Sequence, residues 1–89
     1  MSIKDYIYQI NESCGKHRNF IILLRSNKRD EAIKKILSKT EEKIFDSPLF
    51  IKIKIKGKEV NIYRTGKVLI KDIEGKEELE KFLKEVLID

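Results

Sequence analysis

An unbroken alternation of isoleucine and lysine, from Ile51 to Lys56, is the feature that most constrains the fold of this chain. Successive side chains of a β-strand point to opposite faces, so a strand here has an isoleucine face and a lysine face. Unpaired lysines are almost never found fully buried, whereas isoleucine is among the most buried residues. The segment therefore predicts an antiparallel sheet with one covered face and one face open to water.

Strand patterns also precede and follow this segment. The turns between them are marked by Gly57 and Gly66. The further strands of a meander are expected at residues 44–45, 59–64 and 67–73. The continuous apolar run Phe20–Leu24 indicates one more strand, covered on both sides or central in the sheet. The expected sheet thus has about five strands.

Three segments carry apolar residues at helical spacing. They cover residues 2–13, a stretch capped by Asn27, and the residues that follow Gly75. Apolar stripes of this kind need cover, which the apolar face of the sheet supplies. The predicted fold class is α+β: an antiparallel, curved sheet with helices on one face and an extra N-terminal helix. One domain is expected over residues 1–89, with 1–17 as an extension and 18–89 as its body.

Matching the strand and helix periods gives a predicted core on the covered face. It consists of Phe20, Ile22, Leu24, Ile33, Leu37, Ile51, Ile53, Ile55, Ile62, Ile70, Leu79, Phe82, Leu83 and Val86. The strand at Phe20–Leu24 is apolar on both sides, which an exposed sheet edge does not tolerate. We therefore expect either a homodimer through this strand or coverage of it by the helix at residues 2–13.

The composition limits the classes of protein to which this chain can belong. With 20 basic and 15 acidic side chains the net charge is +5, and the chain has 15 Ile and 16 Lys but one Ala. This bias is typical of archaeal and thermophilic proteins, and an A/T-rich genome gives the same bias. No apolar run is long enough to span a membrane, no signal-peptide pattern begins the chain, and a single cysteine excludes an internal disulfide. These features indicate a cytoplasmic protein.

The basic residues gather in the expected strands. Residues 47–71 carry seven cations and one anion, whereas residues 72–89 carry three cations and seven anions. If the meander is regular, the lysines of the alternating strand share the open face with residues of the next two strands. That set is Lys52, Lys54, Lys56, Asn61, Tyr63, Leu69 and Lys71, with Arg64 nearby. Lysines two apart on a strand lie about 6.6–7 Å apart, close to the phosphate repeat of an extended nucleic-acid backbone.

From Asn19 onward, the order of strand, helix, four strands and helix resembles one repeat of the TATA-binding-protein family. The segment Glu59–Ile70 is similar to that family's hairpin, Arg18-Asn19-Phe20-Ile21 to its opening strand, and Ser47-Pro48 to the start of a later strand. The resemblance implies a half-saddle that binds DNA, rather than RNA, with its open sheet. It also implies that a full saddle needs a homodimer.

The resemblance suggests roles for three residues. Asn19 would reach base acceptors, Tyr63 would insert between base pairs, and Leu69 would contact the groove. Without the resemblance, the pattern favours an ordinary cross-strand aromatic at Tyr63. The lysines also fit solvated strand residues that block aggregation.

The sequence favours a binding protein over an enzyme. Cys14 and His17 are too few ligands for a zinc site, and no residue is placed to orient the histidine. We therefore predict no catalytic residue, no metal and no cofactor. The predicted function is non-enzymatic nucleic-acid binding by the open basic face. The alternative is a protein-interaction module, or accessory subunit, that binds a partner through its helices or a sheet edge.

Overall fold

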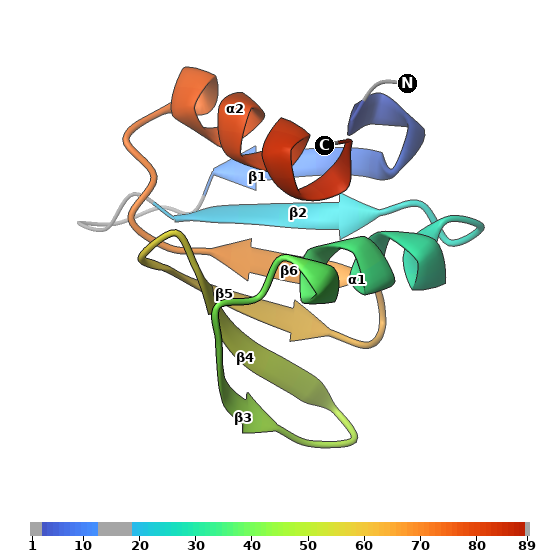
Figure 1. Ribbon diagram of the computed structural model, residues 1–89. Helices are drawn as coiled ribbons and strands as arrows, with labels where there is room; N and C mark the ends of the chain where they lie inside the picture. The colour runs from blue at the N-terminus through green and yellow to red at the C-terminus, as the bar shows by residue number, and fades with distance from the viewer. Residues whose placement is uncertain (1–2, 13–18, 89) are drawn as a thin grey trace.

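The computed structural model describes residues 3–12 and 19–88, which form one six-stranded sheet with two α-helices (Figure 1). In chain order the elements are η1 (Ile3–Asp5), β1 (Ile7–Glu12), β2 (Phe20–Leu24), α1 (Arg29–Ser38), β3 (Glu42–Asp46), β4 (Phe50–Ile55), β5 (Lys58–Tyr63), β6 (Lys67–Ile70) and α2 (Lys76–Leu87). The α+β class and the open antiparallel sheet are as predicted.

The strand order across the sheet is β1-β2-β6-β5-β4-β3, and every neighbouring pair is antiparallel. The meander β3 to β6 is confirmed. The predicted strand count was one too low, because the chain adds β1 at the outer edge of β2. In Figure 1 both helices lie against the same side of the sheet, which leaves the opposite side uncovered among the described residues.

The predicted N-terminal helix is wrong: residues 3–5 form only a 3-10 turn, and β1 follows it. A β-bulge between Ile7 and Gln9 explains the error. It adds one residue to the strand, so that Ile7 and Ile10 both face the covered side, opposite Leu24 and Ile22. An i, i+3 spacing that predicts a helix therefore fits a bulged strand as well.

Strand β2 is covered by the chain itself. It pairs with β1 on one side and with β6 on the other. The expected homodimer through β2 has no free edge to use, and the segment that covers this strand is itself a strand. Pairing with the N-terminal segment satisfies the backbone groups that an apolar edge would have left open.

The predicted core is confirmed in its register. Ile53 is fully buried and its neighbour Lys54 is exposed, as the alternation requires. Of the predicted core residues, Ile33 and Leu37 are only partly buried, because α1 turns Ala32 and Ile36 towards the sheet. Helix α1 also begins without the predicted side-chain cap: its N-cap position is Lys28. Within the described residues, no helix has the length and apolar character to cross a membrane.

Candidate nucleic-acid interface

The open side of the sheet is built from residues that pair directly across four strands. One row runs from Lys52 through Asn61 and Leu69 to Ile21. Directly paired residues of antiparallel strands share a face, so these side chains lie on the side that the helices leave uncovered. Because side chains alternate, the residues two positions along each strand lie on this same side. The strand pairing therefore agrees with the predicted face in this part of the sheet.

Glu59 lies among the lysines of this face. Its carboxylate Oε2 is 2.8 Å from the ammonium of Lys71 and 4.0 Å from that of Lys52. The hydrogen bond from Lys71 is the main cause that lowers the pKa of Glu59 and raises the pKa of Lys71. Lys54, by contrast, has no ion-pair partner among the residues described. The face is thus basic, with Glu59 as its internal anion and with Glu42 of β3 at its edge, directly opposite Lys54.

This arrangement has a consequence for pH dependence. Because the folded-state pKa of Glu59 lies below its unfolded value, the stability it contributes is present above about pH 4.3 and is lost as the pH falls through the folded pKa. Replacing Glu59 with Gln should therefore remove part of the loss of unfolding free energy that wild type shows between pH 6 and pH 3. Urea denaturation at both pH values measures this difference, and equal losses in the two proteins would contradict the assignment.

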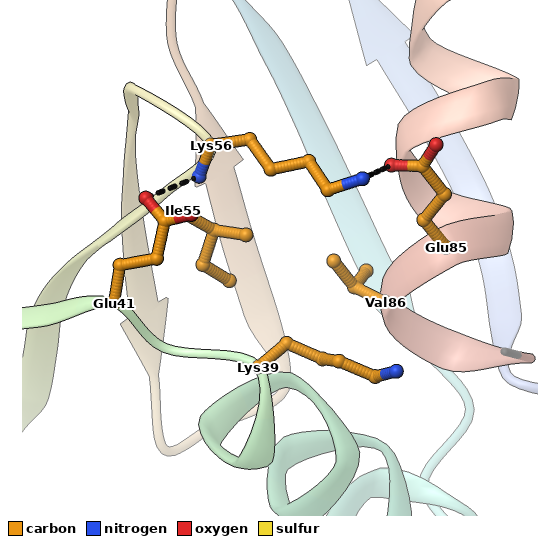
Figure 2. A pocket seen from close by; sticks show the side chains of 6 residues that line it. All are labelled: Lys39, Glu41, Ile55, Lys56, Glu85 and Val86. Atoms are coloured by element: carbon orange, nitrogen blue, oxygen red, sulfur yellow. Dashed lines mark hydrogen bonds and ion pairs between the residues drawn. The ribbon is translucent and has the colours of Figure 1, made fainter.

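Lys56 does not belong to the face, contrary to the prediction. It occupies the two-residue turn between β4 and β5 and has a positive φ of 52°, as does Gly57 with 79°. Figure 2 shows its side chain running towards α2, where the ammonium pairs with Glu85, while its backbone N–H donates to Glu41. A turn residue in the left-handed conformation no longer follows the alternation of the strand, so its side chain need not point to the face that carries the lysines.

Arg64 and Asn19 lie at the margins of the sheet. The Arg64 guanidinium is 3.4 Å from the carboxylate of Asp46 and also donates to the Ser47 carbonyl. The Asn19 side-chain oxygen accepts a hydrogen bond from the backbone N–H of Asp72 at 3.4 Å. Both side chains hold neighbouring segments, so they are placed beside the open face rather than at its centre.

Three aromatic rings form a row at one end of the open face, and only Tyr63 was predicted as a site residue. Phe50 pairs directly with Tyr63, and their ring centroids are 5.5 Å apart. Phe45 continues the row, 5.4 Å from Phe50, and the ammonium of Lys67 lies 5.6 Å from the Tyr63 ring. The alternation of β4 extended one step back, from Lys52 to Phe50, is the sequence signal that could have found the second ring.

Asn61 is the one polar residue that is buried among those described, with 5% of its surface exposed. Its amide nitrogen makes a long hydrogen bond of 3.4 Å to Glu59, and its Oδ1 has no hydrogen-bond partner. A buried amide oxygen without a donor costs free energy, so a small turn of the side chain that brings this atom to a donor is favoured.

The described residues contain no cluster of His, Cys, Asp and Glu that could hold a metal ion. Cys14 and His17 lie outside the described residues. The helix side of the molecule has a hollow between the β4–β5 turn and the ends of both helices, lined by Lys39, Glu41, Ile55, Lys56, Glu85 and Val86 (Figure 2).

Fold and face together define a class: a small α+β domain with two helices on one side of an antiparallel sheet and an aromatic, largely basic surface on the other. Comparisons with known protein families, with curated proteins and with solved structures find no match for this chain.

Proposed function

We propose that this chain is a non-enzymatic nucleic-acid-binding protein of the cytoplasm that uses the open face of its sheet. The observation that carries the proposal is the position of Lys52, Lys54 and Lys71 around Asn61 and Tyr63, on the side that no described helix covers. Lysines supply affinity through counterion release, and an aromatic side chain supplies a stacking surface.

The internal anion sets the expected strength of binding. Glu59 pairs with two of the lysines, so part of their charge is already neutralised in the free protein. A phosphate that approaches Lys52 or Lys71 also meets the carboxylate. We therefore expect moderate affinity and a salt dependence that corresponds to only a few phosphate contacts, with a log–log slope of about −2 to −3.

Wild type and the Glu59→Gln variant together test the proposal. Labelled single-stranded and duplex oligonucleotides are titrated with protein at 50 mM and 200 mM salt, and fluorescence anisotropy reports binding. Wild type should bind at 50 mM salt and lose affinity at 200 mM. The variant should bind about three- to tenfold more tightly and with a steeper slope, because two lysines gain freedom to contact phosphates.

Two results would contradict the proposal. One is the absence of binding to any oligonucleotide by wild type at 50 mM salt. The other is weaker binding by the Glu59→Gln variant while its far-ultraviolet circular dichroism and urea midpoint match those of wild type.

The resemblance to the TATA-binding-protein family leads to a narrower proposal, in which DNA is the ligand and Asn19, Tyr63 and Leu69 contact it. An open antiparallel sheet backed by helices is what that proposal requires. Leu69 and Tyr63 lie on the open side, and Asn19 is at its margin. A titration that compares DNA with RNA of the same sequence tests the choice of DNA.

A second candidate function, protein interaction, is favoured by β3, which is an edge strand of the sheet that the described residues form. Ile44 and Phe45 on this strand and Leu49 just after it are exposed, Leu49 by 78%. Exposed edge strands with apolar side chains pair readily with another chain. A homodimer through β3 is the simplest such assembly. Light scattering at rising protein concentration tests it, because an Ile44→Lys variant should remain a monomer where wild type does not.

A further inference from the structure

The aromatic row is the part of the open face whose geometry points to a particular ligand. Its three rings come from three adjacent strands, and successive centroids are 5.4 Å and 5.5 Å apart. Phe45 is on the last strand of the sheet and is 50% exposed, while Phe50 and Tyr63 are half-buried. The rings are offset and inclined by 36° and 30°, so each contributes part of its surface to the face.

The spacing of the rings distinguishes between two forms of nucleic acid. Bases in a duplex are separated by about 3.4 Å along each strand, which is closer than the rings are to one another. Successive bases of a single strand can separate further, because no base pairing keeps them stacked and the sugar–phosphate backbone can extend. A row of rings between 5 and 6 Å apart therefore suits bases of a single strand, which need no unpairing to reach it.

Asn61 supports the same conclusion independently. Asn61 precedes Tyr63 by two residues on β5 and lies on the same face, so its side chain begins about 7 Å from the base of the Tyr63 side chain. Its buried Oδ1 lacks a donor. The ring N–H groups of thymine, uracil and guanine are such donors, and they are free only where bases are unpaired, because base pairing uses them. Exocyclic amino groups differ, because each keeps one N–H in a groove of the duplex.

The lysines complete the arrangement. The Lys67 ammonium lies over Tyr63, and Lys52 is paired directly with Asn61. Both are within one strand of the rings, so a backbone whose bases contact the row has cations beside it.

We propose that the open face binds single-stranded nucleic acid, with unpaired bases packed against Phe45, Phe50 and Tyr63 and one base donating a hydrogen bond to Asn61 Oδ1. This inference rests on the proposed function, and it adds the strandedness of the ligand and two residues, Phe45 and Phe50, to the interface. DNA and RNA single strands share the chemistry that the rings and the amide recognise.

The experiment compares three labelled probes at 50 mM salt: a 20-nucleotide oligothymidylate, a 20-nucleotide oligouridylate and a 20-base-pair mixed-sequence duplex. At least one single strand should bind about tenfold or more tightly than the duplex. Phe45→Ala should weaken single-strand binding about tenfold with little change in the salt slope, since one stacking contact is lost without loss of charge. Tyr8→Ala is the matched control, because Tyr8 is an exposed aromatic on β1, far from the row in the strand order.

Asn61→Leu provides a second variant that separates binding from folding. Removal of an unpartnered buried oxygen should leave the urea midpoint unchanged or raise it, while single-strand affinity falls. Thymidylate and uridylate differ in the sugar and in the 5-methyl group of the base, so their comparison shows which of the two single strands is preferred. Preference for either strand over the duplex supports the inference.

The inference and the proposed function fail in different ways. Equal affinity for duplex and single strands, with Phe45→Ala binding like Tyr8→Ala, overturns the single-strand inference and leaves nucleic-acid binding in place. No binding of any of the three probes overturns both.

Discussion

Replacing Lys52, Lys54 and Lys71 together with Gln should reduce affinity for nucleic acid at 50 mM salt by about 30-fold or more and flatten the salt slope by about two units on a single strand. The three lysines lie on the side of the sheet that the described helices leave uncovered, and each can neutralise a phosphate. Anisotropy titrations over a range of salt concentrations measure both quantities.

A matched triple variant controls for net charge. Lys34, Lys81 and Lys84 are exposed on the two helices, and replacing them with Gln removes the same three charges. Affinity within threefold of wild type is expected for this variant. Equal losses in the two triple variants would show that only total charge matters and would contradict binding by the face. Lys56→Gln should also bind like wild type, because its ammonium is directed to Glu85.

Replacing Leu83 with Ala should lower the free energy of unfolding by about 2–5 kcal/mol, the largest stability effect expected here. Leu83 is 2% exposed and packs from α2 against the covered face of the sheet. A domain of this size has a total stability near the low end of about 5–15 kcal/mol, so the variant should be partly unfolded at physiological temperature.

Leu69→Ala is the matched control for this effect. It deletes the same atoms from a residue that is half-buried on the open face, and about 1 kcal/mol is expected for the loss. Urea denaturation of both variants measures the difference. Equal destabilisation would mean that the open face is as well covered as the helix side, contrary to the fold described above.

The sequence predicts the part of the fold whose periodicity is uninterrupted. The alternation of β4 fixes Ile53 inside and Lys54 outside, and the stripe of α2 places Leu79 and Leu83 in the core. In these elements one regular period covers the whole segment, so the face of each residue follows from its number alone.

The errors lie where a bulge or a turn interrupts the period. The bulge after Ile7 makes a strand look like a helix, and a register shift between Lys43 and Phe45 decides that Phe45 pairs with Lys52. The positive φ of Lys56 takes its side chain off the lysine face. Each of these features shifts by one residue the set of side chains that face the core. The composition of a strand does not reveal such a shift.

The candidate site was predictable in part for the same reason. Lys52, Lys54, Asn61, Tyr63, Leu69 and Lys71 were placed by alternation alone. The pairing of Glu59 with two lysines, the aromatic row and the orphaned oxygen of Asn61 depend on contacts between strands. Such contacts require the register of the whole sheet, which no single segment specifies.

Methyl NMR spectra of isotope-labelled protein, recorded during titration with an oligothymidylate, test most directly whether the open face binds nucleic acid. Ile21, Leu23 and Leu69 lie on the open face, whereas Leu79, Leu83 and Val86 belong to the buried side of α2. The methyl signals of the first three residues should shift as ligand is added until saturation, and those of the second three residues should stay near their starting positions. Saturable shifts confined to the α2 residues, or no shifts at 50 mM salt with the ligand in excess, would contradict binding by the open face.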